Sequence, residues 1–380
     1  MILLTKKKLL FITGTRADFS KLSTLISAVD SSKYEKLIFT TGMHMLEKYG
    51  LTKLEVQKIS DAEHVDFVNQ RPEDTLDTIL TKTITGLSDY IVEAKPDIVI
   101  FHGDRIESLA AALACSTNYV TSIHVEGGEL SGTIDEVFRH AITKLSDFHL
   151  VCCDEAEERI IQLGENPRRI FNIGSPELDF HSKDSGVLID EVKDYYEIPY
   201  INYGICIFHP ITTEYNTIKS QAENFFNQVI ETNKNFVVIE PNNDMGCNEI
   251  RNVISNLPKE RFRILPSMRF NYFSELMKNC KIFIGNSSVG VREAPFMGLA
   301  SVNVGTRQDR RSNHKSITNL PEINESNLTN IIIREWGKRY ESCKKFWAGG
   351  SANAFKEFIK NQNLDKQIKQ KRFYDLKSDI

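Results

Sequence analysis

The sequence predicts an α/β protein of two domains that face each other across a cleft, each domain built from parallel strands alternating with helices. Short apolar strands of the kind buried in parallel sheets alternate with amphipathic helices in two successive arrays along the chain. The 380 residues also exceed what a single hydrophobic core usually supports. Two such arrays form two Rossmann-like domains.

The first array opens with the apolar strand 9–12, a glycine turn and a helix from about Asp18. A long helix is expected from Leu76 to the residue before Pro96, and another from about Glu155. The polar stretch 60–74 is expected to be a loop. Further strands are predicted at 37–40, 97–101, 122–125, 148–152 and 170–173.

The composition changes over residues 181–200, where we place the interdomain linker. We therefore predict an N-terminal domain over 1–185 and a C-terminal domain over 186–355. The tail 356–380 is predicted to be a helix that packs back on the first domain. Strands of the second array are predicted at 204–208, 236–239, 262–265, 281–284 and 301–304.

Composition excludes several classes of partner. A net charge of −4 argues against nucleic-acid binding, and no apolar run is long enough to span a membrane. Seven cysteines without a CxxC pair fit neither a disulfide framework nor a zinc site, which favours a cytoplasmic protein. The glycine turn after the first strand is not GxGxxG, so no nicotinamide cofactor is indicated, and we expect no cofactor.

Carboxylates follow two neighbouring strands of the first array. Asp104 comes after strand 97–101 and Glu126 directly after strand 122–125, and Asp135 opens the next helix. The carboxyl ends of parallel strands form the ligand-binding edge of an open sheet. Asp135 and Arg139 could form an ordinary surface ion pair one helical turn apart. Because Asp104 and Glu126 converge on the same edge, we favour general acid–base chemistry.

The second array offers an anion site. Ser287 and Ser288 lie between a buried strand and a helix, where small residues let backbone N–H groups approach a phosphate. The loop could also be a simple serine cap. Arg307, which ends the next strand, makes a phosphate site the better interpretation, and Glu293 would then suit a diol such as ribose.

Arg16 and Ser20 occupy the corresponding place in the first domain, where a guanidinium can hold a phosphate. A surface salt bridge is an equal alternative for Arg16. Among the histidines His44, His140 and His209, we favour His209, which follows a strand of the second domain. No histidine and carboxylate cluster has the spacing of a metal site, so we predict metal independence.

Taken in order, the motifs resemble the hydrolysing UDP-N-acetylglucosamine 2-epimerases over nearly the whole chain. The first-domain motifs are Gly-Thr-Arg-Ala-Asp (14–18), Gly-Met-His (42–44), His-Gly-Asp-Arg (102–105), Glu-Gly-Gly-Glu (126–129) and Ser-Gly-Thr-Ile-Asp (131–135). The second-domain motifs are His-Pro-Ile-Thr-Thr (209–213), Gly-Asn-Ser-Ser (285–288), Gly-Val-Arg-Glu (290–293) and Gly-Thr-Arg (305–307).

The resemblance implies a GT-B-like fold and cleavage of UDP-N-acetylglucosamine to N-acetylmannosamine and UDP, a step toward sialic acids. UDP and the C2 proton would leave to give 2-acetamidoglucal, and water would then add. The non-hydrolysing relatives lack the acidic motifs of residues 126–135, which favours hydrolysis. The family also suggests a homodimer or homotetramer. By resemblance the candidate acids and bases are Asp104, Glu126, Asp135 and His209.

Contacts with the UDP-sugar are also assigned by resemblance. We expect them from Arg16, Ser20, His44, Arg105, Arg139, Asn242, Ser287, Ser288, Glu293 and Arg307. Three alternatives stay open. The same chemistry could act on UDP-2,4-diacetamido-2,4,6-trideoxy-glucose, on the legionaminic acid route. The protein could instead be a GT-B glycosyltransferase, or a nucleotide-sugar binding protein without catalysis.

Overall fold

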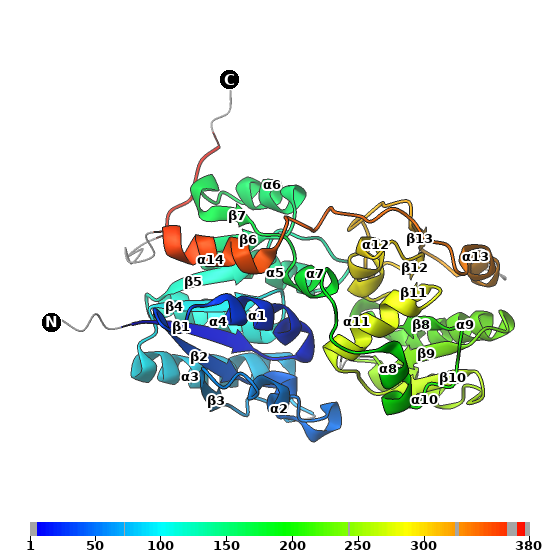
Figure 1. The fold of residues 1–380 in the computed structure, drawn as a ribbon. Helices are drawn as coiled ribbons and strands as arrows, with labels where there is room; N and C mark the ends of the chain where they lie inside the picture. Colours follow the sequence, from blue (N-terminus) through cyan, green and yellow to red (C-terminus); the bar gives the residue numbers. More distant parts are fainter. Residues whose placement is uncertain (1–5, 72, 242–243, 324–326, 363–370, 377–380) are drawn as a thin grey trace. The chain divides into compact units, whose positions relative to one another are not determined.

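A computed structural model describes residues 6–376 except residue 72 and segments 242–243, 324–326 and 363–370. The chain folds into two compact units (Figure 1). The described strands form one parallel sheet in each unit, so the predicted α/β architecture of two Rossmann-like domains is confirmed. The first unit comprises Met1–Glu129, Asp135–Asp179 and Phe346–Ile380, and the second comprises Leu130–Ile134 and Phe180–Lys345.

The sheet of the first unit has the order β3-β2-β1-β4-β5-β6-β7 among the described strands. Its neighbours pair in parallel, for example β1 with β4 through Leu10 and Val99. The chain order reverses between β1 and β4, which makes that position the switch point of the sheet. The strands are β1 (Lys7–Thr13), β2 (Tyr34–Thr40), β3 (Glu63–Asp66), β4 (Ile98–His102), β5 (Thr121–Val125), β6 (Phe148–Val151) and β7 (Ile170–Asn172).

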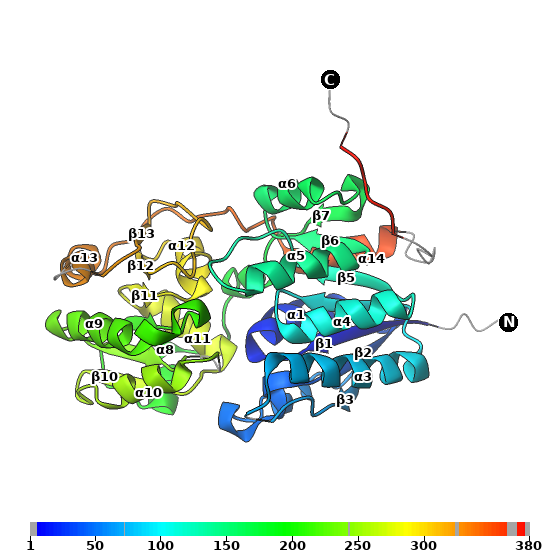
Figure 2. The ribbon, with the colours of Figure 1, turned by 180° about the vertical axis from the view of Figure 1, so that it is seen from behind.

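Helices cover both faces of this sheet because its strands are apolar on both sides. Alternate residues of β1 enter different cores: Leu9 and Phe11 pack with α1 and α14, whereas Leu10 and Ile12 pack with α3, α4 and α5. Figures 1 and 2 show these two layers in front of and behind the sheet. The helices are α1 (Arg16–Ala28), α2 (Lys53–Val56), α3 (Leu76–Ala94), α4 (Ile106–Thr117), α5 (Asp135–Leu145), α6 (Asp154–Gln162) and α14 (Ser351–Asn361), with α7 (Pro176–His181) crossing the boundary between the units.

The sheet of the second unit has the order β10-β9-β8-β11-β12-β13, with its switch point between β8 and β11. One face packs on α9, α10 and α13, and the other on α8 and α11. The strands are β8 (Gly204–Ile207), β9 (Phe236–Ile239), β10 (Phe262–Leu265), β11 (Phe283–Gly285), β12 (Ser301–Val304) and β13 (Ile317–Leu320). The helices are α8 (Ile189–Tyr196), α9 (Ile218–Glu231), α10 (Cys247–Ser255), α11 (Phe270–Asn279), α12 (Glu293–Phe296) and α13 (Asn327–Glu335).

Two edge strands differ from the sequence prediction. Residues 60–74 were expected to form a loop, but β3 lies within that stretch, and β13 was not predicted. In β3 the side chains of Glu63 and Asp66 are exposed and none of the four residues is buried. Edge strands of this kind are held by backbone pairing with one neighbour, so they need no apolar pattern from which they could be recognised.

The division of the chain also differs in detail from the sequence prediction. The boundary lies at Asp179–Phe180, before the linker that composition suggested, and the chain returns to the first unit at Phe346. The C-terminal helix α14 ends at Asn361, shortly after its last apolar contacts, Phe358 and Ile359. Those two side chains join the core of the first unit. Of the predicted helix 356–380, residues 371–376 are not helical, and residues 363–370 and 377–380 lie outside the described residues.

A buried carboxylate holds the segment around Lys371 on the first unit. Glu165 Oε1 lies 2.6 Å from Lys144 Nζ, and Oε2 lies 2.7 Å from Lys371 Nζ and 3.1 Å from His149 Nε2. Burial opposes ionisation of Glu165, but His149 and the charge of Lys371 lower its pKa to about 2. Glu165 is therefore a charged structural residue at neutral pH.

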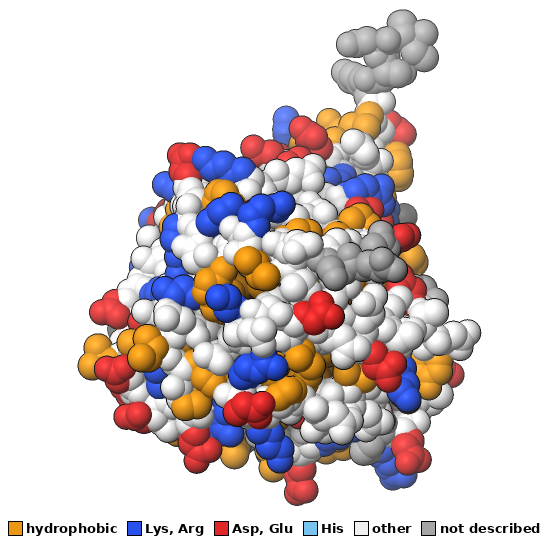
Figure 3. All heavy atoms as spheres, turned by 90° about the vertical axis from the view of Figure 1, so that its right-hand side faces the viewer, with side chains coloured by type: hydrophobic (Ala, Val, Ile, Leu, Met, Phe, Trp, Pro, Cys, Tyr) orange, Lys and Arg blue, Asp and Glu red, His pale blue; other side chains and the backbone are white. Residues whose placement is uncertain are grey.

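The surface carries mixed charge. On the face drawn in Figure 3, Lys and Arg side chains are interspersed with Asp and Glu and with apolar side chains. No single sign of charge covers that face, so attraction of an anion there depends on local groups rather than on a broad field. In the described part of the chain, no helix is both long enough and apolar enough to cross a membrane.

Candidate functional site

The predicted residues of the first unit gather around the switch point of its sheet. The loop after β1 leads into α1 through a capping box, in which the Thr15 hydroxyl accepts from the Asp18 N–H and Asp18 accepts from the Thr15 N–H. The loop after β4 carries Asp104, and β5, the next strand, ends immediately before Glu126. These loops lie at the carboxyl edge, as the sequence predicted.

Glu126 has a carboxylate surrounded by hydrogen-bond donors. Lys21 Nζ and His102 Nε2 lie 2.8 Å and 2.9 Å from Oε2, and the Ser175 hydroxyl donates to Oε1. The residue is 2% exposed. A carboxylate removed from water needs hydrogen-bond partners, and these three groups hold the Glu126 side chain in one position.

The backbone of Glu126 is also unusual. Its φ of +63° lies in the left-handed region, which non-glycine residues rarely adopt and which costs free energy. The N–H of Glu126 donates to the Leu150 carbonyl at 2.8 Å, so pairing with β6 continues up to the turn. The left-handed turn directs the side chain away from the strand path and toward Lys21 and His102.

Lys21, His102, Ser175 and Glu177 were not among the residues selected from the sequence. Lys21 Nζ bridges Glu126 and Glu177, the second at 3.3 Å, and the Ser175 hydroxyl oxygen also lies 2.7 Å from Oε2 of Glu177. His102 stood in a recognised motif and could have been selected. Lys21 had a weaker signal, a cation in the second turn of the helix that follows the first strand.

Asp104 and Arg139 form the second cluster of this edge. The guanidinium of Arg139 donates to Asp104 and, at 2.9 Å, to the Glu129 carbonyl. Burial alone would lower the pKa of Arg139, but the carboxylates of Asp104 and Glu129 raise it above its usual value. Asp135, the first residue of α5, adds to this effect.

Two of the predicted ligand contacts have other partners in this structure. Arg139 is buried and holds carboxylates, instead of presenting its guanidinium to solvent. His44 is fully buried, with Nε2 2.9 Å from the Thr13 hydroxyl and Nδ1 2.7 Å from that of Thr52. Burial lowers the pKa of His44 to about 4. Both ring nitrogens of His44 are thus engaged by hydroxyls of its own unit in this structure, and its contact with a ligand stays a prediction.

The other predicted contacts of the first unit remain partly accessible. Arg16 is the first residue of α1, and Ser20, one turn later, donates its hydroxyl to the Ala17 carbonyl at 2.8 Å. Arg105 lies 3.3 Å from Glu107 through Nε. All are side chains at the carboxyl edge, where the sequence placed them.

In the second unit Asn286 connects the loops around the switch point. Its side chain accepts from the His209 N–H at 2.6 Å and donates to the His209 carbonyl at 2.8 Å. Its own carbonyl accepts from Arg307 at 3.4 Å and from Gln308 at 3.0 Å. Burial and the nearby charge of Arg307 hold the pKa of His209 well below its ordinary value, so its imidazole is neutral at pH 7.

The anion site predicted in this unit contains hydrogen-bond donors that have no partner among the described residues. No hydrogen bond joins the hydroxyls of Ser287 and Ser288 to another described residue, and the buried Nε of Arg307 likewise has no partner there. Unpaired donors beside a short helical turn, Ser288–Gly290, favour an anionic ligand. Asn242, another predicted contact, lies outside the described residues.

A short stretch of the first unit's connecting loop belongs to the second unit. The Gly132 N–H donates to the Arg307 carbonyl at 3.2 Å, within the segment Leu130–Ile134. A Cβ on Gly132 would collide with the Thr306 carbonyl, so the close approach requires glycine. Asp135 follows this segment directly.

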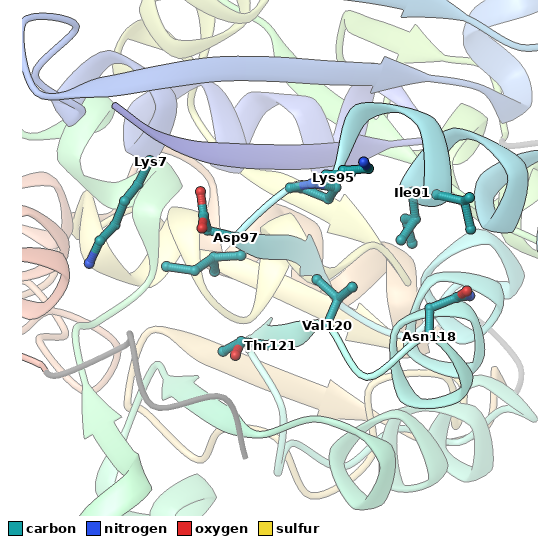
Figure 4. Close-up of a pocket in the computed structure, with 10 residues that line it drawn as sticks. Lys7, Ile91, Lys95, Asp97, Asn118, Val120 and Thr121 are labelled. Atoms are coloured by element: carbon teal, nitrogen blue, oxygen red, sulfur yellow. The ribbon is translucent and has the colours of Figure 1, made fainter. Parts of the chain in front are cut away.

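A separate pocket lies at the opposite edge of the first sheet. Its volume is about 450 Å³, and its lining includes Lys7, Lys95, Asp97, Asn118 and Thr121 (Figure 4). These residues are at or near the amino ends of β1, β4 and β5. The pocket contains none of the predicted site residues. Among the described residues, no group of three or more His, Cys, Asp or Glu side chains is arranged to hold a metal ion.

Sequence comparisons identify similar proteins. Residues 27–360 match the family described as UDP-N-acetylglucosamine 2-epimerase. A protein of that name from Neisseria meningitidis is 40% identical, covering 97% of this chain and 99% of its own length. The UDP-N,N′-diacetylbacillosamine 2-epimerase (hydrolyzing) of Legionella pneumophila is 30% identical, covering 96% and 98%.

Solved structures are similar in fold. The UDP-GlcNAc 2-epimerase of Methanocaldococcus jannaschii, in complex with UDP-GlcNAc and UDP, superposes with a TM-score of 0.80 at 18% identity, covering 93% of this chain and 99% of that one. A UDP-GlcNAc 2-epimerase from Neisseria meningitidis bound to UDP-GlcNAc gives 0.76 at 18% identity, covering 93% and 98%. At this identity the likeness concerns the fold alone.

Proposed function

Because the chain belongs to the UDP-N-acetylglucosamine 2-epimerase family, we propose that it is a hydrolysing member, which converts UDP-N-acetylglucosamine and water to N-acetylmannosamine and UDP. The observation that carries the proposal is the Glu126 carboxylate, held by Lys21 and His102 at the switch-point edge. The hydrolysing relative from Legionella, at 30% identity, supports the hydrolytic outcome.

The proposed reaction has two halves. In the first, a base takes the C2 proton, a C1–C2 double bond forms, and the C1–O bond breaks with its electron pair leaving on UDP. In the second, water adds to the resulting 2-acetamidoglucal: its oxygen bonds to C1, and a proton is delivered to C2 from the opposite face. The first half needs a base and the second an acid, as paired carboxylates provide.

We assign this proton chemistry to Asp104, Glu126, Asp135 and His209. Glu126 has Lys21, His102 and Ser175 as partners, through which a proton can be held or passed. Asp104 is the more accessible carboxylate, with a side chain 28% exposed, and Arg139 fixes its orientation. The imidazole of His209 is in the neutral form that accepts a proton, and burial beside Arg307, which lowers its pKa, makes it a weaker base than an exposed histidine.

We assign the nucleotide to the loops around the second switch point. Ser287, Ser288 and Arg307 offer unpaired donors to the diphosphate, and Glu293 offers acceptors to the ribose diol. Arg16, Ser20 and Arg105 remain proposed contacts from the first unit, and Asn242 remains a sequence-based expectation.

Replacing Arg307 tests the nucleotide assignment. Arg307→Ala should weaken UDP binding by about 10- to 100-fold, because a hydrogen bond to a charged group contributes about 1.5–3 kcal/mol. Calorimetric titration with UDP measures the change. Arg310→Ala is the matched control, since Arg310 is an exposed arginine of the same loop whose partner is Asp309. Equal affinities of the two variants would contradict the assignment.

The identity of the released sugar tests the overall proposal. With UDP-N-acetylglucosamine the protein should release N-acetylmannosamine and UDP, detected by chromatography and NMR. The relative from Legionella makes UDP-2,4-diacetamido-2,4,6-trideoxy-glucose the substrate to compare. Release of N-acetylglucosamine would overturn the proposed epimerisation.

The yield of N-acetylmannosamine should be unchanged in excess EDTA, because acid–base chemistry by these side chains requires no metal ion. Loss of turnover that a divalent ion restores would overturn the proposed metal independence.

A further inference from the structure

His181, the last residue of α7, is a buried histidine to which the proposed reaction gives no role. It belongs to the second unit, and its side chain is fully buried. Nδ1 lies 2.8 Å from the Ser274 hydroxyl on α11, and Nε2 lies 3.3 Å from Oε1 of Glu293 on α12. The ring also packs against Phe270, with centroids 5.2 Å apart.

We propose that His181 is a positioning residue that holds the Glu293 carboxylate in the orientation that binds the ribose diol. The inference rests on the proposed nucleotide site and adds to it a residue that does not touch the ligand. It would explain why a histidine and a carboxylate lie together in the core, 5% and 6% exposed, beside a loop that presents donors to an anion.

The hydrogen-bond pattern of the pair supports this role. An ionised carboxylate only accepts, so Nε2 of His181 must carry the proton that is donated to Glu293. The Ser274 hydroxyl can then donate to Nδ1, which fixes the tautomer and the ring orientation. The chain Ser274–His181–Glu293 thus has one direction of donation, ending at the carboxylate.

Glu293 retains one acceptor for a ligand. Oε1 is engaged by His181, and no hydrogen bond joins Oε2 to another described residue. Among the described residues, Oε2 is not one of the buried side-chain atoms that lack a hydrogen-bond partner. A ligand can therefore reach it. Because a carboxylate oxygen has two lone pairs, Oε2 can accept from both hydroxyls of a vicinal diol. Fixing it in advance reduces the conformational entropy lost on binding.

A purely structural histidine would have a different signature. If His181 only filled the core beside Phe180 and Phe270, its replacement would lower stability and affect every nucleotide ligand alike. If it positions Glu293 for the diol, the loss must depend on the presence of that diol. Comparison of UDP with 2′,3′-dideoxy-UDP separates the two roles.

The variants for the test are His181→Phe, which keeps a ring but removes the donor, and His181→Gln, whose amide N–H can replace it. His181→Phe should weaken UDP binding by about 5- to 20-fold and leave binding of 2′,3′-dideoxy-UDP within about twofold. His181→Gln should recover part of the loss. Glu293→Gln should show the same ligand dependence. The double variant His181→Phe/Glu293→Gln should bind UDP no less tightly than the single variant with the lower UDP affinity, because both changes act on one contact.

Ser274→Ala guards against misfolding, because it removes the partner of Nδ1 without altering α7, and it should produce a smaller, diol-dependent loss. All variants are measured by calorimetry on the full chain after thermal unfolding has shown that they fold. Equal weakening of both ligands, or unchanged UDP affinity in His181→Phe, would overturn the inference. Failure of the unchanged protein to bind UDP would be a different result, which overturns the nucleotide site as well.

Discussion

Turnover in deuterated water is expected to place deuterium at C2 of the N-acetylmannosamine that the protein releases. Elimination removes the original C2 proton, and hydration supplies a new one that originates from solvent. In ¹⁸O-labelled water the label should appear at the anomeric oxygen and be absent from UDP, because elimination breaks the C1–O bond and leaves the P–O bond intact. NMR of the sugar and mass spectrometry of both products measure these labels.

The same experiment separates the alternatives. A non-hydrolysing epimerase would exchange the C2 proton, but its product would remain linked to UDP, without solvent oxygen at C1. A glycosyltransferase that slowly hydrolyses its donor would keep the C2 hydrogen and the gluco configuration. A nucleotide-sugar binding protein would release no sugar. Retention of the original hydrogen at C2 would therefore rule out elimination, whatever sugar the protein uses.

Replacing Glu126 by glutamine should lower kcat by about 10²- to 10⁴-fold, the usual contribution of a general acid or base. Glutamine keeps the size of the side chain, but an amide cannot transfer protons at neutral pH. Its NH₂ group would also face Lys21, His102 or Ser175, which now donate to the carboxylate. Affinity for UDP should largely persist, since Glu126 is not among the proposed UDP contacts.

Glu165→Gln is the matched control for that experiment. Glu165 is likewise a buried carboxylate with cationic partners, Lys144 and Lys371, but it lies after α6, away from the proposed site residues, and holds the segment around Lys371. Its replacement should reduce thermal stability and leave kcat of the folded protein close to that of the unchanged protein. If Glu126→Gln retained kcat within a few-fold, or if both variants lost it equally, Glu126 would have no chemical role.

The sequence was sufficient for the architecture because the central strands are apolar on both faces. Fully apolar runs such as Leu9–Ile12 are typical of buried parallel strands. The order of these strands along the chain places Asp104 and Glu126 at one edge of the sheet. The edge strand β3 could not be recognised in this way, because its residues bury nothing and its pairing is carried by the backbone.

Individual side chains of the site were harder to predict because their neighbours come from distant parts of the chain. Glu126 and Ser175 are far apart in sequence, and their hydrogen bond joins the residue after β5 to the residue before α7. For His44 the motif was recognised, but nothing in the sequence indicated that its side chain is fully buried. Spacing in sequence indicates which residues share an edge, whereas exposure depends on the assembled core.

The segment Leu130–Ile134 has a consequence for how proteins of this kind can diversify. Recombination that exchanged residues 180–345 with those of a relative would bring in a new Arg307 loop but leave the old Gly132 beside it. Because Gly132 has no room for a side chain against Thr306, a mismatch there would displace the backbone immediately before Asp135. The nucleotide loop and the acidic loop should therefore be inherited together, and their lineages should share one history even though some 170 residues separate them.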